Sequence, residues 1–385
     1  MRSGSKVQSK INAIIYGQQW AGKSTYAAGM AKLKRPDGKP YRVLICDAEM
    51  GSADEVITKL ADEGVKEDNI LLIYSQSLEE INHYIALAAK KENIPVLGDD
   101  GEETEDIVLD ADGEPFHPDA LVIDGSTVIK MACQQSLLNL SRKRARVRAN
   151  KNGLTGEERA VAIDNASLEM KDWGNLGYSG QSLILNLCAS GLDWIVTCRE
   201  KEKKENRVVN GQIQSISTGV YEPDSFAGVS YNCKTIMRFW RDPDDPDVVK
   251  MTVEKDRTGT YATGQVIENP QVTDFQPLIS NKIGKEFTPR NTMEQAIEIE
   301  SKMYQKQAGI LDEDVSQSQP SQPTVTAEDL KKQISALRSK MGTEQRKQLS
   351  DRIKSENIPT SLGKIEDTNI LSRVVVICKE IVEAE

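Results

Sequence analysis

The chain has 385 residues, 28% of them charged and 38% hydrophobic, and its formal net charge at pH 7 is −10. That length allows two or three domains, and the acidic balance excludes a uniformly basic coat for nucleic acid while leaving room for a local basic patch. The six cysteines form no CxxC pair, and the two histidines, His83 and His117, cannot build a His/Cys metal site. No apolar run is long enough to cross a bilayer and no signal-peptide core opens the chain, so we expect a cytoplasmic protein without membrane contact.

Strand-like and helix-like segments alternate through the first 125 residues. The apolar runs that predict strands lie at 11–16, 42–47, 69–74 and 119–124. The segments with helical periodicity lie at 24–33, 52–64 and 77–91. Strands alternating with helices of this length are typical of βαβ units, so we predict an α/β fold with a mainly parallel sheet and helices on both faces.

Two segments of opposite charge interrupt the pattern. Residues 99–114 carry nine acids and no base, and we expect an acidic hairpin or loop inserted at about 96–118. Residues 142–151 carry six bases and no acid. The acidic segment should lie on the surface, because charged runs are solvated.

The remaining segments predict one more helix and strand, then a separate module. A helix at 175–191 leads to a fifth strand at 193–198 and a polar loop at about 199–220, and two antiparallel edge strands follow at 235–240 and 248–256. The domains that we predict are a core at 1–290, a helix at 291–310, a flexible linker at 311–326 and a helical carboxy-terminal module at 327–385.

One motif determines the class of site. The segment GQQWAGKST fits the P-loop pattern GxxxxGK[ST], and it starts where a predicted strand ends and leads into a helix. Its backbone amides would surround phosphate oxygens, Lys23 would reach the β and γ oxygens of ATP, and Ser24 would ligate Mg²⁺. The alternative is a glycine turn that only caps a helix. The residues of the expected nucleotide site are Gly17, Gln18, Gln19, Trp20, Ala21, Gly22, Lys23, Ser24 and Thr25.

Two carboxylates are candidates for the chemistry beside this loop. Asp124 ends the strand ALVID and is the expected second ligand on the metal side. Glu49 follows the strand that ends at Asp47, and in a doubly wound sheet ligands bind beyond the carboxyl ends of the strands. Glu49 would then orient and deprotonate the attacking water. The alternative is that Asp47 or Glu49 merely caps the helix that begins near Ser52.

These residues resemble the core of RecA-type ATPases, in which a strand after the P-loop helix ends in Asp-Ala-Glu. The segment CDAEMGS matches that element, and 67–81 and 121–129 resemble the family's next strand and helix and its metal-side strand. More closely, 11–280 resembles the phage-encoded RecA-like ATPases of the Sak single-strand-annealing group. The blocks that carry this closer resemblance are VIDGST, DWGNLG, WIVTCREKE and VEKDRTG.

The resemblance implies roles for individual residues. Glu49 takes the place of the family's hydrolytic base. Where the family often has a polar amide that senses the γ-phosphate, this chain has Thr197 and Arg199. Lys255 and Arg257 match a pair that contacts the γ-phosphate held by the neighbouring subunit, which implies a homo-oligomer.

The resemblance also implies partners. RecA-like proteins hold single-stranded DNA on two loops, which correspond here to about 142–172 and 200–220. The protein would therefore hydrolyse ATP and act on single-stranded DNA in phage-type recombination or replication. The carboxy-terminal module lies outside the resemblance, and a single-strand-binding protein is a further candidate partner through it. The alternatives are a P-loop kinase of a small molecule and an ATP-switched assembly module without significant turnover. The candidate DNA contacts are Arg142, Lys143, Arg144, Arg146 and Arg148.

Overall fold

The computed structural model describes most of the chain and divides it into two compact units. The two units are Met1–Glu300 and Ser301–Glu385. Residues 281–292 and 308–326 are outside the described part, so the flexible linker at 311–326 stays a prediction. The described residues are 9–98, 103–209, 212–280, 293–307, 327–339, 341–355 and 368–383.

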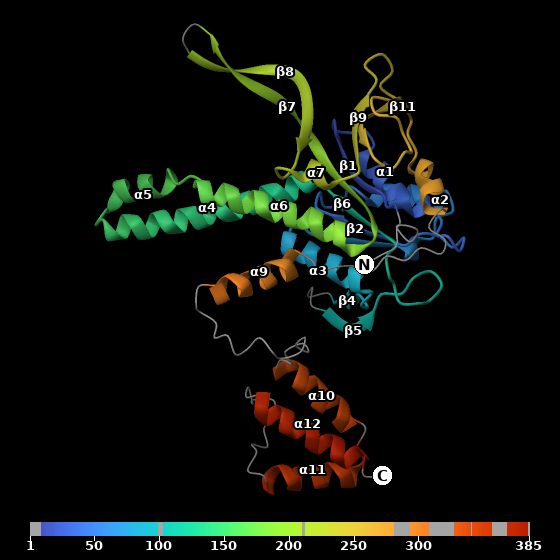
Figure 1. Ribbon diagram of the computed structural model, residues 1–385, viewed down its shortest axis with the longest axis vertical. Helices are drawn as coiled ribbons and strands as arrows, with labels where there is room; N and C mark the ends of the chain where they lie inside the picture. The colour runs from blue at the N-terminus through green and yellow to red at the C-terminus, as the bar shows by residue number, and fades with distance from the viewer. Residues whose placement is uncertain are drawn as a thin grey trace. The chain divides into compact units, whose positions relative to one another are not determined.

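A nine-stranded sheet forms the first unit (Figure 1). The order along the sheet is β11-β10-β9-β1-β7-β6-β2-β3, and β8 pairs with β7. Strands β1, β2, β3, β6, β7 and β9 run parallel, which confirms the predicted α/β fold with a mainly parallel sheet. The strands are β1 (Asn12–Gly17), β2 (Val43–Asp47), β3 (Ile70–Tyr74), β6 (Ala120–Asp124), β7 (Asp193–Val209), β8 (Gln212–Asp224), β9 (Thr235–Arg241), β10 (Val249–Asp256) and β11 (Val266–Glu268).

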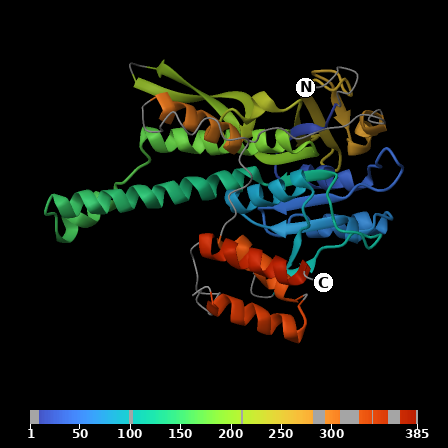
Figure 2. The same ribbon diagram turned by 60° about the horizontal axis from the view of Figure 1, so that its bottom comes forward.

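Helices cover both faces of this sheet (Figure 2). Successive side chains of β1 alternate between two apolar clusters, with Ile15 in one and Ile14 in the other. The first cluster packs under α1 (Lys23–Ala28) and α2 (Asp54–Asp62), and the second under α3 (Leu78–Lys90), the start of α4 (Ser126–Lys151) and α6 (Met170–Ser190). Burial on two faces explains why the strands read as unbroken apolar runs in the sequence.

Two strand predictions are wrong. The strands predicted at 235–240 and 248–256 form and pair antiparallel as expected, but they are not at the edge of the sheet, because β9 lies between β1 and β10, and β11 pairs with the outer side of β10. The predicted polar loop at 199–220 is instead a long hairpin of β7 and β8, which projects from the sheet in Figure 1. A two-stranded ribbon buries little on either face, so its sequence lacks the apolar alternation from which strands are predicted.

The basic segment at 142–151 also differs from the prediction. It lies in the outer half of α4, and with α5 (Gly156–Asp164) it forms a helical arm that extends away from the sheet (Figure 1). The stretch 142–172, which the resemblance assigns to a DNA-binding loop, is therefore largely helical. An unbroken run of good helix formers such as Arg and Ala accounts for this.

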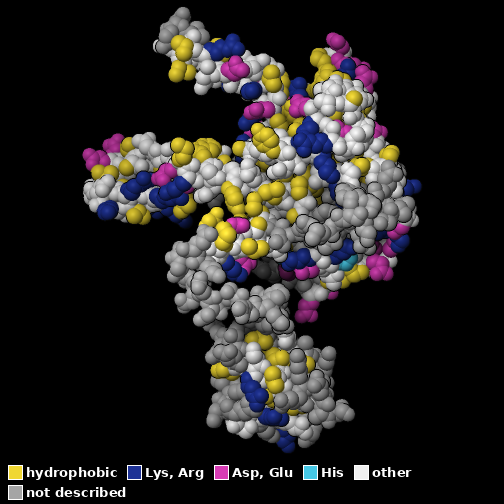
Figure 3. Space-filling view, viewed as in Figure 1, with side chains coloured by type: hydrophobic (Ala, Val, Ile, Leu, Met, Phe, Trp, Pro, Cys, Tyr) yellow, Lys and Arg dark blue, Asp and Glu magenta, His cyan; other side chains and the backbone are white. Residues whose placement is uncertain are grey.

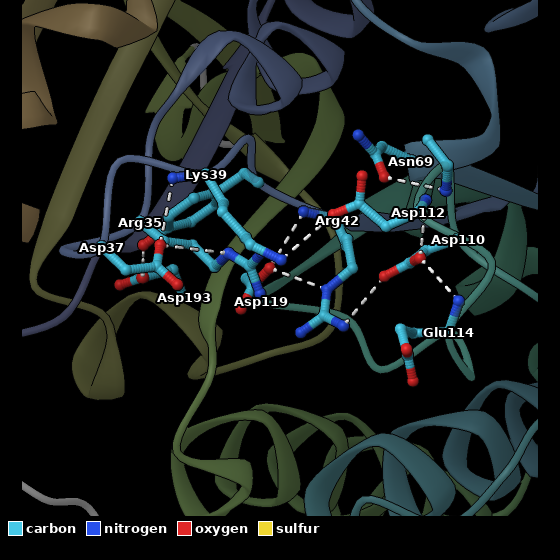
Figure 4. Close-up of polar contacts among 12 residues, drawn as sticks. Arg35, Asp37, Lys39, Arg42, Asn69, Asp110, Asp112, Glu114, Asp119 and Asp193 are labelled. Carbon is cyan, nitrogen blue, oxygen red and sulfur yellow. Dashed lines mark hydrogen bonds and ion pairs between the residues drawn. The ribbon is translucent and has the colours of Figure 1, made fainter.

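The acidic insertion contains the hairpin of β4 (Pro95–Leu97) and β5 (Glu103–Ile107). After it, an ionic network joins the insertion to the amino-terminal edge of the sheet (Figure 4). Arg42 donates to Asp119 at 3.1 Å and to Asp110 at 3.3 Å, and Lys39 donates to Asp112 at 3.2 Å. Asp110 also accepts the backbone N–H of Asp112 and of Glu114, which closes its turn.

The second unit contains the predicted helical module. Its helices are α10 (Ala327–Ser339), α11 (Thr343–Ser355) and α12 (Thr368–Glu383). Apolar residues from all three, including Leu330, Leu349 and Val374, form one buried cluster. A further helix, α9 (Met293–Gln307), spans the boundary between the units. Among the described residues, no helix has the length and apolar character that crossing a membrane requires.

Candidate functional site

The phosphate loop lies between β1 and α1. Gly17 ends β1 with φ of 148°, and a Cβ there would come within 1.9 Å of the Phe239 carbonyl oxygen, so only glycine fits. Gly22 caps α1 in the left-handed conformation, and Ser24 lies half-buried in the first turn of that helix. The Lys23 ammonium donates to the carbonyl oxygens of Gly17 and Gln18, at 3.2 and 2.6 Å. The loop therefore already curves around the cation, as the motif requires.

The electrostatics of Lys23 connect it to the two predicted carboxylates. Burial lowers the pKa of Lys23, and the negative charges of Glu49 and Asp124 act in the opposite direction. These three residues come from α1, from the segment after β2 and from β6, and in the sheet β7 lies between β1 and β6, with β2 beyond β6. That the three share one nucleotide site stays a prediction.

Trp20 lies at a bend of the phosphate loop that a distant residue, Arg241, holds in place. Its backbone has φ of 63°, which is uncommon for a bulky side chain, and 78% of its surface is exposed. Arg241, at the end of β9, donates from Nε to the Trp20 carbonyl oxygen at 2.8 Å, and its backbone N–H reaches Gln18 Oε1 at 3.3 Å. A residue more than 200 positions away thus holds the loop in shape.

Asp124 is buried and both of its oxygens accept from hydroxyl groups. Ser52 Oγ donates to Oδ2 at 2.6 Å, and Thr197 Oγ1 donates to Oδ1. Thr197 also accepts the backbone N–H of Gly125 at 2.9 Å. The two hydroxyls fix the orientation of the carboxylate, which suits a group that must point at a metal ion or at water bound to it.

The turn after β2 separates the roles of Asp47 and Glu49. Asp47 is fully buried and accepts from the backbone N–H groups of Glu49 and Gly51, both at 2.8 Å, and from Ser52 Oγ at 3.0 Å. Asp47 therefore closes the turn that leads into α2. Glu49 accepts none of these bonds, so the alternative in which Glu49 is the cap has no support in this geometry.

Glu49 points toward β7. Its side chain passes over Gly125, where a Cβ would lie 2.6 Å from Glu49 Cγ, so a glycine is needed beneath it. Arg199 donates to Glu49 Oε1 from Nε at 3.2 Å and from Nη2 at 3.1 Å. Arg199 stands beside Gly17 in the register of β7 with β1, which places this pair next to the phosphate loop.

A second group of charged side chains lies at the base of the β7–β8 hairpin. Arg238 donates to Glu200 at 2.9 Å and stacks over the Tyr221 ring at 4.2 Å. Tyr16, the last residue before Gly17, donates to Glu254 and lies 3.2 Å from the Tyr221 carbonyl oxygen. The hairpin is thus connected to the phosphate-loop strand. The sequence gives no local signal for these pairs, because they depend on which strands are neighbours.

Lys255 and Arg257 lie far from their own phosphate loop. Strand β10 runs antiparallel to β9, so Lys255 pairs with Ile236, which in turn pairs with Ile14 in the middle of β1. Lys255 Nζ donates to the carbonyl oxygens of Ser230 and Tyr231, at 3.0 and 3.4 Å. Lys255 lies within β10, whereas Arg257 follows the end of that strand at Asp256, so the two are not on one face of a single strand. Neither residue belongs to the phosphate site of its own chain.

The basic segment of α4 has two faces. Arg144 donates to both oxygens of Asp172 at 2.9 Å, and Arg148 donates to Glu169 at 3.1 Å. The backbone N–H of Glu169 and the Arg144 guanidinium hold the pKa of Asp172 below its usual range. An open groove of about 480 Å³ lies here, and it includes a cation that the sequence did not single out, Lys171. The groove is lined by Lys143, Arg144, Val147, Arg148, Glu169 and Lys171.

Comparison with known proteins finds similar solved structures but no similar sequence. No protein-family profile and no curated protein sequence matches the chain. Among solved structures, the chain resembles RadB recombinase, with 14% identity, coverage of 68% of this chain and 87% of the other, and a TM-score of 0.34. It also resembles a KaiC-like protein of the hyperthermophilic archaeon Pyrococcus horikoshii, with 12% identity, coverage of 68% and 92%, and a TM-score of 0.34. Similarity at this level assigns neither a family nor an activity to the chain.

Proposed function

We propose that this protein is a RecA-like P-loop ATPase that hydrolyses ATP with Mg²⁺ and works on single-stranded DNA, in phage-type recombination or replication. The observation that carries the proposal is that β7, the strand beside the phosphate-loop strand, holds both carboxylates: Arg199, the register partner of Gly17, bonds Glu49, and Thr197 bonds Asp124. A phosphate cradle, a buried carboxylate and a second carboxylate on one edge of a parallel sheet form the set that nucleotide hydrolysis needs.

The residues present fit Mg-ATP. The loop from Gly17 to Gly22 curves around a cation, and the amino terminus of α1 favours an anion. Ser24 and the oriented Asp124 would hold Mg²⁺, and Lys23 would exchange its bonds to loop carbonyls for bonds to phosphate. Bound Mg²⁺ would supply positive charge to the phosphate oxygens.

Glu49 is the proposed base, and its ion pair with Arg199 bears on when it acts. Arg199 holds Glu49 Oε1 in two hydrogen bonds, at 3.2 and 3.1 Å, so a water molecule must compete with the guanidinium for that oxygen. The γ-phosphate is a competing anion for Arg199, and a shift of Arg199 toward it would release Glu49 to accept a proton from water. Arg199 would then serve in the place where the resemblance puts a phosphate-sensing amide.

The exposed side of α4 supports the proposed contact with DNA. Dark blue side chains gather along the arm in Figure 3, although the chain as a whole is acidic. Arg144 and Arg148 are occupied by Asp172 and Glu169, so the phosphate contacts fall mainly to Arg142, Lys143 and Arg146. Contacts to phosphates give affinity without base preference.

A site shared between copies of the chain is part of the same proposal. Lys255 bonds the carbonyl oxygens of Ser230 and Tyr231, and no contact of Lys255 or Arg257 with the phosphate loop occurs among the described residues, so they would act on the nucleotide of a neighbouring copy. A cation supplied in trans stabilises the charge that develops on the γ-phosphate. The protein would then be a homo-oligomer. The carboxy-terminal module would contact a single-strand-binding protein.

The direct test is phosphate release from ATP, measured with and without a poly(dT) oligonucleotide and with no other acceptor. The proposal expects hydrolysis that rises when DNA is added. Phosphate transfer only after a small-molecule acceptor is supplied would establish a kinase instead. Tight ATP binding without turnover under any condition would establish an assembly switch.

A further inference from the structure

The outer half of α4 leaves a set of cations on the surface. Arg142, Lys143 and Arg146 are exposed and form no ion pair with any residue that the structure describes. Their spacing places them on one side of the helix, whereas Arg144 and Arg148 face Glu169 and Asp172. We name the three exposed cations the basic face. Val147, which is 67% exposed, lies beside them.

The β4–β5 hairpin presents the opposite charge. Glu103, Glu105 and Asp106 are exposed on β5, and we name them the acidic hairpin. Glu103 pairs with His83 at 3.3 Å, while Glu105 and Asp106 have no ion pair within the described ranges. Leu97, on the neighbouring strand, is 43% exposed. This hairpin therefore also combines uncompensated charge with an exposed apolar side chain.

Charges elsewhere in the insertion are already satisfied within the chain. Asp110 is paired with Arg42, and Asp112 with Lys39 and Lys66. Such internal pairs explain why the part of the insertion after β5 folds back onto the sheet. Within the acidic hairpin, Glu105 and Asp106 have no such partner among the described residues, so their charge is available to another molecule.

The two surfaces lie apart on the same unit. The arm of α4 and α5 projects to one side of the sheet, and β4–β5 lies beneath α3, away from the arm (Figure 1). Since these elements are not neighbours, the acidic hairpin of a chain does not cover its own basic face. Two complementary surfaces that do not meet within one molecule would meet between two copies.

We propose that the acidic hairpin of one copy docks on the basic face of a second copy. The contact sets Glu105 and Asp106, beside Leu97, against the three cations of the basic face beside Val147, and it is head-to-tail, because different surfaces of the two copies take part. It goes beyond ATP hydrolysis and does not require it. One consequence rests on the proposed function: the hairpin would occupy cations that also contact DNA phosphates, so single-stranded DNA would compete with self-association.

Charge reversal in the full-length protein tests this contact by sedimentation without nucleotide. The wild type should self-associate at about 50 mM salt and dissociate at about 500 mM, because exposed charge pairs are screened. Glu105→Lys/Asp106→Lys alone, and Arg142→Glu/Lys143→Glu/Arg146→Glu alone, should each sediment as a monomer at low salt. An equimolar mixture of the two variants should associate again, since each now carries the surface that the other needs.

The matched control is Glu55→Lys/Asp62→Lys, which makes the same change in net charge on two exposed positions of α2 and should leave self-association intact. A wild type that stays monomeric at low salt would overturn the proposal. So would a mixture that stays monomeric while circular dichroism shows both variants folded. If the basic-face variant loses poly(dT) binding but still self-associates, the face serves DNA alone and the docking contact is refuted. Loss of ATP hydrolysis in these variants would bear on the proposed function and not on the docking.

Discussion

Charged residues are arranged differently at the two ends of the parallel strands, which we call the amino-terminal and carboxyl edges of the central sheet. At the amino-terminal edge, Arg42 and Asp119 form a pair in which the side chains are only 15% and 21% exposed, and neighbouring acids are bonded to the same network. At the carboxyl edge, Arg199 and Glu49 form a pair with side chains 56% and 33% exposed. Lys23 there bonds only its own loop among the described contacts. Breaking a buried pair leaves an uncompensated charge in the interior, whereas the partners of an exposed pair are partly solvated and can exchange.

The largest effect that we expect comes from removing the cation of the phosphate loop. Lys23→Ala should lower ATP hydrolysis by about 100-fold or more, because the phosphate charge loses its nearest cation. Isothermal titration with ATP and a phosphate-release assay measure the effect. The control Lys59→Ala, on the exposed side of α2, should retain wild-type turnover. Normal hydrolysis by Lys23→Ala would remove the basis of the site.

The second prediction concerns Lys255 and Arg257, which would act on the nucleotide site of a neighbouring copy. Lys255→Ala/Arg257→Ala should still bind ATP but hydrolyse it poorly, since these cations would complete the site of a neighbouring copy. Mixing this variant with Glu49→Gln should recover part of the activity, because mixed assemblies regain some intact sites. Absence of recovery, with both variants shown to co-assemble, would assign Lys255 to the capping of the Ser230 and Tyr231 carbonyls alone.

The third prediction concerns the amino-terminal edge. Asp119→Ala should lower the free energy of unfolding by about 1–3 kcal/mol, because it leaves Arg42 Nε and the Arg42 backbone N–H without their acceptor. Urea denaturation measures the loss, with Asp62→Ala as an exposed control. Hydrolysis per folded molecule should not change. A large loss of turnover without a loss of stability would mean that the two edges are not separate in function.

The fourth prediction is the smallest and concerns DNA. Arg142→Ala/Lys143→Ala/Arg146→Ala should weaken binding to oligonucleotides of different sequence to a similar degree. The slope of log affinity against log salt should become shallower by about 2, since three phosphate contacts are lost. Fluorescence anisotropy across a salt series measures it. An unchanged slope would show that the arm does not contact DNA. The control variant replaces by alanine three exposed lysines of the first unit that lie outside the arm, Lys59, Lys66 and Lys90.

Local patterns in the sequence predict the parts of the site that depend on neighbours in the chain. The P-loop requires a strand, a glycine turn and a helix in succession, and these are continuous in the sequence, so Lys23 could be identified. Asp124 and Glu49 each follow a short apolar strand, which places them at the carboxyl edge of any parallel sheet. The predicted fold class follows from the same alternation of strands and helices.

Contacts between distant strands could not be predicted in the same way. The pairing of Arg199 with Glu49, and of Thr197 with Asp124, depends on β7 lying between β1 and β6, and no local pattern specifies that order. Ser52 looked like the start of a helix, and its contact with Asp124 appears only when β2 and β6 are adjacent. The β7–β8 hairpin was missed because its charged strands lack apolar alternation.

The measurement that tests the central claim most directly is the behaviour of Glu49→Gln. The amide keeps the size of the side chain and can still bond Arg199, but it cannot accept a proton from water. We expect ATP to bind with near wild-type affinity in the presence of Mg²⁺, and hydrolysis to fall by about 100-fold or more. Turnover close to that of the wild type would contradict the account, because Glu49 would then be only a surface partner of Arg199.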